Sequence, residues 1–299
     1  MSHRPARTSG RQKASAANLD CASVFQTMAL DCVAAIKAHH SSACAGDVEA
    51  VHQIRVAITR LRAAVAFFAP IVADAEWLRL KKEIAWLNGP LGAARDSDVV
   101  VEYARRKRYH AWAQRRIGES LDQRQMRDRR ALVRCLRSAR TQRLVAAMAD
   151  WIRQGPWLER HKRRNNAEAL QSYCTRELDR WHKRLIRKGR NLKTLGAAPR
   201  HRLRIRAKRF RYMLEALAET GTLGERDEFR RRHRLAKRLQ RTLGDLRDLR
   251  RFAGFADGSP PAQNGKGAKK HPPGYRHRRQ KLFDAAIAAH RDLERAGAP

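Results

Sequence analysis

Two segments of this chain repeat each other, and a second pair of related segments follows them in the same order. The first pair is VHQIRVAITRLRAAVAFF at 51–68 and RHRLRIRAKRFRYMLEAL at 200–217; the second is LNGPLGAARD at 87–96 and LQRTLGDLRD at 239–248. The two offsets, 201 − 52 = 149 and 243 − 91 = 152, nearly agree. Because internal repeats mark duplicated structural units, the chain is predicted to form two related halves, about 18–155 and 165–296, facing each other about a pseudo-two-fold axis.

Nearly every segment places apolar residues at helical rather than strand spacing. Ala, Leu, Arg and Gln, which favour helix, dominate the sequence. We therefore expect an all-α fold. The predicted helices are 18–40, 47–69, 74–89, 96–117, 120–154, 165–192, 199–219, 225–243, 245–256 and 275–296.

The ends of these helices are predicted from capping residues. Asp47 and Asp74 are expected N-caps, and Pro199 an expected first helical position. The glycines expected to end helices are Gly92, Gly196, Gly221 and Gly244. Asp96 and Asp98, at and after the first LG-x-x-RD element, are expected to cap the next helix. Asp245 and Asp248 of the second element are expected either to cap the next helix or to orient basic side chains, and none of the four is expected to touch an anionic ligand.

Each copy of the repeated helix has a cationic face and a separate apolar stripe. At about 100° per residue, one face of the first copy carries His52, Arg55, Thr59 and Arg62. The same face of the second copy carries His201, Arg204, Lys208 and Arg211. Arg offers a fork of donors that matches phosphate oxygens, and Lys offers a mobile point charge. A basic row is often only a solvated face, but its repetition favours binding of an anion.

The net charge of the chain points to an anionic partner. Lys and Arg number 66 against 29 Asp and Glu, so 66 − 29 = +37. A compact protein with this charge repels itself. The excess is typical of proteins that bind nucleic acid, another polyphosphate or an anionic membrane surface, and charge alone does not choose among them.

Several classes of protein are disfavoured by composition. The five cysteines are odd in number and form no CxxC, so a disulfide framework or a zinc knuckle is not expected. No apolar run of about 18 residues is evident, which predicts no membrane span. Residues 1–17 lack the apolar core of a secretory signal and are expected to form a disordered basic arm. Residues 257–274 are expected to form a flexible basic loop.

Together, the four repeated segments resemble the CHAD domain, the conserved histidine α-helical domain, over roughly residues 18–296. The resemblance implies an all-α fold of two pseudo-symmetric antiparallel bundles, about four helices each, around a basic central cavity. It also implies binding of inorganic polyphosphate without catalysis or cofactor, in the cytoplasm at polyphosphate granules. The chain lacks the ExExK strand of the triphosphate-tunnel hydrolases to which such domains are often fused, which favours a standalone binding module.

Ligand contacts are implied by the resemblance position by position. In the first half they are His52, Arg55 and Arg62; in the second they are His201, Arg204, Lys208, Arg211 and, on the helix leading to LGDLRD, Lys237. Arg184 and Lys188 lie where other helices of the family add basic groups. Thr59 departs from the pattern, since a basic residue is common there, and this predicts a weaker or differently shaped contribution from the first half.

Three functions are compatible with the sequence, and a polyphosphate-binding protein is the leading one. A nucleic-acid-binding protein is the alternative, with nonspecific binding by the basic arm and loop, although no recognised nucleic-acid motif is found and aromatic residues are only 6%. An enzyme acting on phosphate compounds is disfavoured, because the chain has no GxxxxGK[ST] or RHG motif and few clustered carboxylates for metal-dependent phosphoryl transfer.

Overall fold

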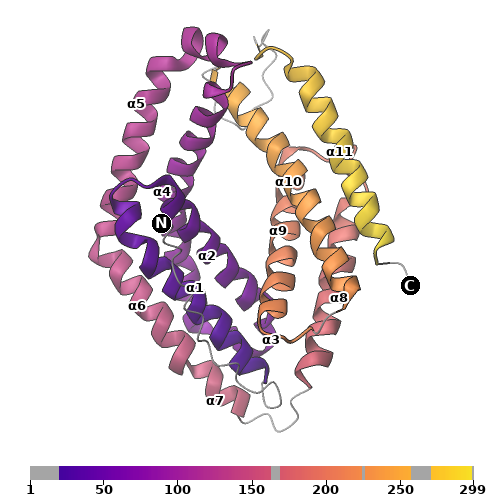
Figure 1. Cartoon of the computed structure of the whole chain (residues 1–299). Coiled ribbons are helices and arrows are strands. Elements are labelled where there is room, and N and C mark those ends of the chain that lie inside the picture. Colours follow the sequence, from indigo (N-terminus) through magenta and orange to yellow (C-terminus); the bar gives the residue numbers. More distant parts are fainter. Residues whose placement is uncertain (1–19, 163–168, 224–225, 257–270, 298–299) are drawn as a thin grey trace, which may run out of the picture.

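The computed structural model describes residues 20–162, 169–223, 226–256 and 271–297. In these residues it contains helices and turns and no strand, so the predicted all-α fold is confirmed (Figure 1). The helices are α1 (Cys21–Cys44), α2 (Val48–Phe67), α3 (Ala69–Val72), α4 (Ala75–Arg105), α5 (His110–Arg137), α6 (Ala139–Gln154), α7 (Pro156–Lys162), α8 (Leu170–Gly189), α9 (Ala197–Glu219), α10 (Asp227–Ala256) and α11 (Tyr275–Arg295).

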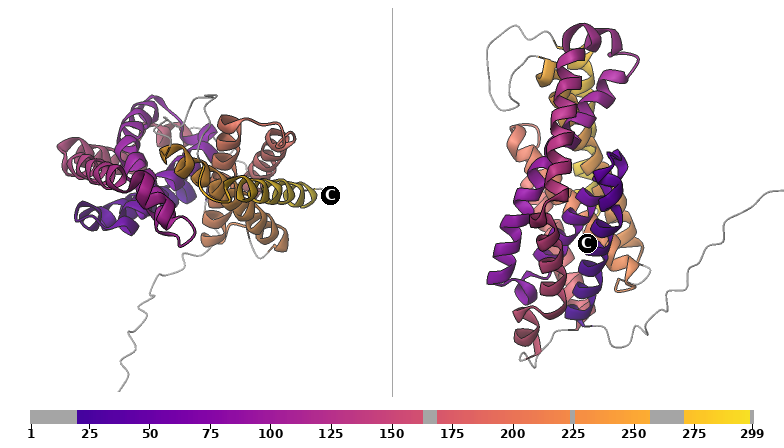
Figure 2. Two further views of the ribbon diagram at one scale, coloured as in Figure 1. Left: turned by 90° about the horizontal axis from the view of Figure 1, so that it is seen from above. Right: turned by 90° about the vertical axis from the view of Figure 1, so that its left-hand side faces the viewer.

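Helices α1 to α7 lie on one side of the molecule and α8 to α11 on the other, as Figure 1 and the view from above in Figure 2 both show. Within the first side α1 packs on α2 and α4 on α5; within the second, α9 packs on α10 and α10 on α11. The two sides meet through α2 against α9 and α4 against α10. The repeated segments thus supply the helices that join the two sides.

A continuous apolar core crosses the boundary between the halves. The aromatic rings of Phe67 and Phe68 from the first half pack on Tyr173 of α8, with ring centroids 6.1 and 5.7 Å apart. The Tyr173 hydroxyl donates a hydrogen bond to the Phe67 carbonyl oxygen at 2.8 Å. A second apolar cluster, which includes Tyr103, Tyr109 and Phe252, joins α4 and α5 to α10. Since buried aromatic rings contribute much of the apolar area in a core, these contacts fix how the halves sit.

Several predicted helix ends are confirmed. The Asp47 carboxylate accepts from the backbone N–H of Glu49 at 2.8 Å, and that of Asp74 accepts from Trp77 N–H at 2.7 Å, so both aspartates are N-caps. Gly221 follows α9 with φ +74°, a left-handed conformation that favours glycine.

Other predicted ends are wrong. Helix α4 runs unbroken through Pro90 and Gly92, and α10 runs unbroken through Gly244. A predicted single helix over 120–154 is instead divided at Ser138, whose hydroxyl accepts from Thr141 N–H and caps α6.

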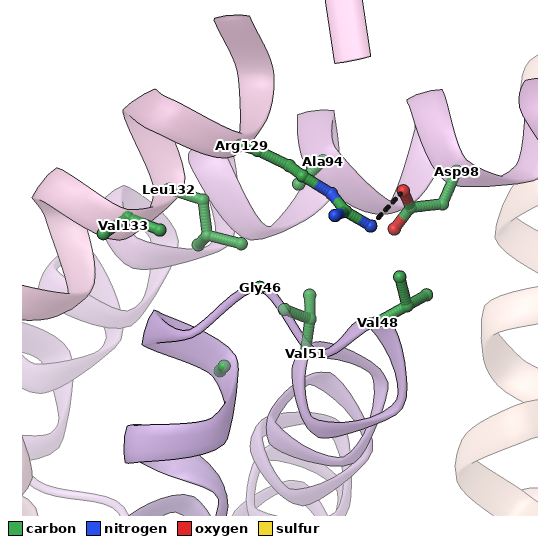
Figure 3. A pocket seen from close by; sticks show the side chains of 9 residues that line it. Gly46, Val48, Val51, Ala94, Asp98, Arg129, Leu132 and Val133 are labelled. Carbon is green, nitrogen blue, oxygen red and sulfur yellow. Dashed lines mark ion pairs between the residues drawn. The ribbon is translucent and has the colours of Figure 1, made fainter. Parts of the chain in front are cut away.

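The expected capping role of the acidic residues in the LG-x-x-RD elements is also wrong, because all of them lie inside α4 or α10. Asp98 is buried and faces α5, where Arg129 lies 3.6 Å away and the Gln125 amide donates to its carboxylate at 3.0 Å. Figure 3 shows Arg129 reaching toward Asp98 above a small cavity that Val48 and Val51 also line. Asp98 therefore holds α5 on α4.

Helix α1 corrects the expectation that no segment is apolar enough to span a membrane. Its most apolar window of 18 residues has a mean hydropathy of 1.3, and half of that window is buried within the fold. Phe25 and Val33 of α1 are almost fully buried in the main core. A core helix passes the same test of length and composition as a spanning one.

The expected basic arm, 1–17, lies outside the described residues, as does the expected loop 257–274 except for its last four residues. In that part, Gly274 has φ +69° and directly precedes α11. The arm and the loop stay predictions.

Candidate functional site

The repeated helices α2 and α9 touch each other at corresponding positions. The Lys208 ammonium donates to the Thr59 hydroxyl oxygen at 3.5 Å, and the Thr59 hydroxyl donates to the Arg55 carbonyl oxygen at 2.8 Å. The offset, 208 − 59 = 149, equals that of the repeated histidines. A contact between corresponding positions is what a pseudo-two-fold axis between the two helices would produce.

Cationic side chains from four helices gather near this contact. We call this group the interior cluster; α2 supplies His52 and Arg55, α4 supplies Arg95, α9 supplies His201, Arg204 and Lys208, and α10 supplies Arg247 and Arg251. The charges of its members act on one another across both halves. The structure thus brings together five of the residues predicted from the sequence: His52, Arg55, His201, Arg204 and Lys208. An open central cavity around them stays a prediction.

Burial and mutual repulsion make the cations of the interior cluster easier to deprotonate. Burial, followed by the positive charges of Arg204, Arg55, Arg211 and Arg247, lowers the pKa of Lys208 to about 7. Burial and the charges of Arg247, Arg95 and Arg204 lower the pKa of Arg55 to about 10. Both shifts have the sign expected for cations that lose water and lie near like charges.

The two repeated histidines respond in the same way. Burial lowers the pKa of His52, and the charge of Arg95 lowers it further. Burial lowers the pKa of His201, and Arg247 and Arg204 add to the effect. Both rings are therefore neutral near pH 7 when no anion is bound, and a neutral imidazole can still donate one hydrogen bond to a phosphate oxygen.

The described residues place no carboxylate next to four cations of the interior cluster. Among the described residues, no carboxylate oxygen lies within 4.0 Å of the side-chain nitrogens of Arg55, Arg95, Arg204 or Lys208. Two buried nitrogen atoms in the group, Arg204 Nε and His201 Nδ1, have no hydrogen-bond partner among the described residues. Because an unpaired buried donor is costly, this arrangement is suited to an anionic guest that would supply the missing acceptors.

Aspartates offset the charge at the α10 side of the interior cluster. Asp96 of α4 pairs with Arg251 and lies 3.7 Å from Arg247, so it links the two halves. Asp248 lies 3.8 Å from Arg247, and burial raises the pKa of Asp248. Arg247 and Arg251 are thereby held in place by carboxylates, whereas Arg55, Arg204 and Lys208 have no carboxylate of a described residue within 4.0 Å.

The glycines within α4 and α10 provide room for the repeated arginines. A Cβ atom on Gly92 would lie 3.5 Å from Arg55 Nη1, and one on Gly244 would lie 3.3 Å from Arg204 Nε. Each repeated arginine thus lies against the glycine of its own half. The LG-x-x-RD element supplies this close approach in both halves, and it is tighter at Gly244 than at Gly92.

Arg211, predicted as a ligand contact, is already engaged. Its guanidinium donates to the Glu215 carboxylate at 2.5 Å and to the Gln240 amide oxygen at 2.8 Å. It also stacks over the Tyr212 ring, 4.3 Å from the centroid. The charge of Arg211 reaches Lys208, but its Nε and one Nη nitrogen are engaged by Gln240 and Glu215.

The remaining predicted contacts lie away from the interior cluster. Lys237 is exposed on α10, and Arg184 and Lys188 are exposed on α8. Arg62 is half-buried and lies near Arg209, whose pKa it lowers in addition to the effect of burial. None of these four acts on Lys208 or Arg55.

Three members of the interior cluster were not predicted from the sequence: Arg95, Arg247 and Arg251. The repeat could have identified two of them, because Arg95 and Arg247 are the arginines of the two LG-x-x-RD elements. Their offset, 247 − 95 = 152, equals the offset between Leu91 and Leu243 of the same elements. Arg251 follows one helical turn after Arg247, but no counterpart in the first half points to it.

Comparisons with known proteins agree with this architecture. The family model described as "CHAD domain" matches residues 27–257. The crystal structure of the CHAD domain from the plant Ricinus communis is similar over 97% of both chains, with 24% sequence identity and a TM-score of 0.69. PptA from Streptomyces chartreusis is similar over 92% of this chain and 97% of its own, with 17% identity and a TM-score of 0.56. A search of curated proteins gave no match. The match to the family model covers well over half of the chain, which therefore belongs to the CHAD domain family.

Proposed function

We propose that this protein binds inorganic polyphosphate in the interior cluster, without turning it over. The observation that carries the proposal is the group formed by Arg55, Arg204 and Lys208, which come from both halves and have no carboxylate within 4.0 Å among the described residues. Without an anion these cations repel one another, and a chain of phosphates would reverse the sign of that interaction. The family resemblance implies the same ligand.

The chemistry of the interior cluster suits a phosphate chain better than a nucleic acid. Tyr212 is the aromatic ring beside the cluster, and the cations of Arg211 and Lys208 already lie over it, 4.3 and 5.2 Å from its centroid. Bases of single-stranded nucleic acid are usually held by stacking on free aromatic faces. Polyphosphate has no bases and requires only charge and hydrogen-bond donors, which this cluster supplies.

Binding of fluorescently labelled polyphosphate, followed by anisotropy at fixed salt, tests this proposal. The double variant Arg55→Ala, Arg204→Ala should lose at least tenfold in affinity, since each buried charge-assisted contact contributes roughly 1.5–3 kcal/mol. The matched control, Arg105→Ala with Arg153→Ala, removes two exposed cations and should change the affinity less than threefold. Equal losses from both pairs would show that binding is spread over the surface and would refute the assignment.

Two further measurements address the other functions. Competition between polyphosphate and transfer RNA at equal phosphate concentration should favour polyphosphate at physiological salt. Release of phosphate from polyphosphate over hours, with and without Mg²⁺, should stay at the background rate. Turnover that disappears in the Arg55→Ala, Arg204→Ala variant would instead establish an enzyme. Within cells, the proposal places the protein in the cytoplasm at polyphosphate granules, which imaging of the tagged protein can check.

A further inference from the structure

The C-terminal half of α8 and the turn after it carry a dense group of exposed cations. We call this group the α8 patch; its members are Lys183, Arg184, Arg187, Lys188, Arg190 and Lys193, all exposed. The sequence has no acidic residue between Asp179 and Glu215. No carboxylate oxygen of a described residue lies within 4.0 Å of a cation in the α8 patch. The patch therefore presents uncompensated positive charge to solvent.

The acidic side chains nearest in sequence are already engaged elsewhere. Asp179 pairs with the buried Arg232 at 2.5 Å, and the buried Glu177 pairs with Arg180 at 2.7 Å. These ion pairs leave neither carboxylate free to neutralise the patch. By contrast, exposed arginines on other helices, such as Arg79, have a carboxylate one turn away on their own helix.

The support under the α8 patch is rigid. Leu192, in the middle of the turn, is only 3% exposed, and its N–H donates to the Gly189 carbonyl oxygen at 3.0 Å. The His290 imidazole of α11 hydrogen-bonds to the Ile186 carbonyl oxygen at 3.1 Å. The ring packs so closely on Gly189 that a Cβ atom there would clash with it. The cations thus project from a fixed frame, which lowers the entropic cost of binding a partner.

A structural role at the end of α8 accounts for only part of the patch. Cations in the last turn of a helix are stabilised by the helix dipole, and this explains Arg187 and Lys188. Lys183 and Arg184 precede the last turn, while Arg190 and Lys193 follow the helix. The effect falls off within one turn, so it also accounts for Arg190, the C-cap residue, but not for Lys183, Arg184 or Lys193.

The chemistry of the patch selects among anionic partners. The nearby Trp181 ring packs on Phe67 of the core, with centroids 5.4 Å apart, and the patch itself contains no aromatic residue on which a base could stack. The exposed large apolar side chains of the described residues are Leu78 and Met126, which lie on α4 and α5. The patch therefore lacks the apolar anchor typical of membrane-surface helices.

The spacing of these cations suits a rigid row of phosphates. The four members within α8, from Lys183 to Lys188, span five residues at 1.5 Å each, or roughly 8 Å along the helix axis. This length matches two to three phosphates along one strand of B-DNA, and Arg190 and Lys193 extend the row into the turn. We propose that the α8 patch binds the phosphate backbone of double-stranded nucleic acid, without base specificity, at a surface separate from the interior cluster. This function goes beyond polyphosphate binding and does not depend on it.

Two variants with equal charge test this proposal in the full-length chain. The patch variant replaces all six members of the α8 patch with Gln. The control variant replaces three exposed lysines and three exposed arginines scattered over other helices and turns: Lys37, Lys81, Lys107, Arg105, Arg143 and Arg153. Each variant lowers the net charge from +37 by six, 37 − 6 = +31. Binding of a 20-base-pair DNA duplex and of polyphosphate is measured by anisotropy over a range of KCl concentrations.

The patch variant should bind the duplex on the order of tenfold to a hundredfold more weakly. Its salt slope should be reduced by about 3 to 5, since each phosphate contact contributes about 0.9 and the patch offers roughly three to six contacts. The control variant should change duplex affinity less than threefold. The Arg55→Ala, Arg204→Ala variant should lose polyphosphate affinity and keep duplex affinity, which separates this proposal from the proposed function.

Equal losses in the patch and control variants would overturn the assignment, because they would show that net charge alone holds the duplex. Binding to phosphatidylserine vesicles that depends on the patch, with no effect on DNA, would overturn it in favour of a membrane surface. Should the sixfold variant unfold, the triple variant Lys183→Gln, Lys188→Gln, Lys193→Gln applies the same criterion, with about half the loss of slope.

Discussion

Raising the pH from 6 to 9 is expected to weaken polyphosphate binding roughly 90-fold through one side chain, Lys208. Burial and the neighbouring charges of Arg204, Arg55, Arg211 and Arg247 lower the pKa of Lys208 from 10.5 to about 7 in the empty protein. A bound phosphate chain would return the pKa toward its ordinary value by supplying negative charge. Binding then requires uptake of a proton at any pH above 7.

The magnitude follows from the fraction of Lys208 that is charged before binding. With a pKa of about 7, the Lys208 side chain of the unliganded protein is about 90% charged at pH 6 and about 1% charged at pH 9. The logarithm of Kd should rise by about one per pH unit above pH 7, and about 0.9 proton should be taken up per site at pH 8. His52 and His201 titrate below this window, because their pKa values are also lowered.

The stability of the empty protein should change in the opposite direction. Unfolded, Lys208 has its ordinary pKa of 10.5; folded, its pKa is about 7. Between these values the unfolded state binds more protons, so this group makes the free energy of unfolding rise with pH, by up to about 1.4 kcal/mol per unit. As the pH rises, the polyphosphate affinity should therefore fall while the free energy of unfolding rises. This combination identifies a cation that neighbouring charges repel when no anion is bound.

Calorimetric titration with long-chain polyphosphate, in buffers of different ionisation enthalpy at pH 8, measures the proton uptake directly. Lys208→Gln should abolish the uptake and flatten the dependence of Kd on pH between 7 and 9. The exposed Lys81→Gln is the matched control and should leave both unchanged. Proton uptake near zero in the unmodified protein would refute the electrostatic argument, whatever the affinity.

Three further results are expected. Gly244→Ala should lower polyphosphate affinity several-fold, because its Cβ would lie 3.3 Å from Arg204 Nε, and should keep or raise thermal stability, because alanine favours the helix by about 1 kcal/mol. Gly92→Ala, where the corresponding distance is 3.5 Å, should lower the affinity less. Equal losses of affinity would contradict the steric account. Glu215→Gln should raise the affinity by releasing Arg211, as anisotropy can show. Polyphosphate at 100 times its Kd should stabilise the fold by about 2.7 kcal/mol; an unchanged melting temperature would contradict binding to the folded state.

Much of the fold could be predicted from the sequence, because apolar periodicity and capping are local. Asp47 and Asp74 cap their helices as their positions predict. The failures occur where a distant side chain decides the local structure. Gly92 and Gly244 resemble helix ends in sequence, but each lies inside a helix, against an arginine of the neighbouring repeated helix.

The site divides in the same way. Helical spacing places His52 and Arg55 on one face of α2, and it places His201 and Arg204 on the same face of α9. These four members of the interior cluster could therefore be predicted. Helical spacing would also have predicted the i,i+4 ion pair of Arg211 with Glu215, but not its bond to Gln240, which comes from another helix. The exposure of Arg184 could not be predicted either, because it depends on which side of α8 faces α9 and α11.

Thr59, the departure from the family pattern, has a physical explanation in the contact it makes. It lies 3.5 Å from Lys208, at the corresponding position of the other repeat. Two lysines at this contact would repel each other by up to about 4 kcal/mol at an effective dielectric constant near 20. A single lysine supplies the charge there, and the threonine hydroxyl accepts its hydrogen bond. The difference between the repeats therefore relieves repulsion, and need not weaken the first half.

Thr59→Lys tests this explanation, because it would place two ammonium groups at the contact between α2 and α9. At pH 6, where Lys208 is charged, the variant should unfold at a lower temperature than Thr59→Val, which keeps the shape of threonine and removes its hydroxyl. The deficit should shrink toward pH 9, and saturating polyphosphate should stabilise Thr59→Lys more than Thr59→Val. Thermal unfolding followed by circular dichroism measures all three. If Thr59→Lys were as stable as Thr59→Val at pH 6 without polyphosphate, repulsion at this contact would not be what excludes a second lysine.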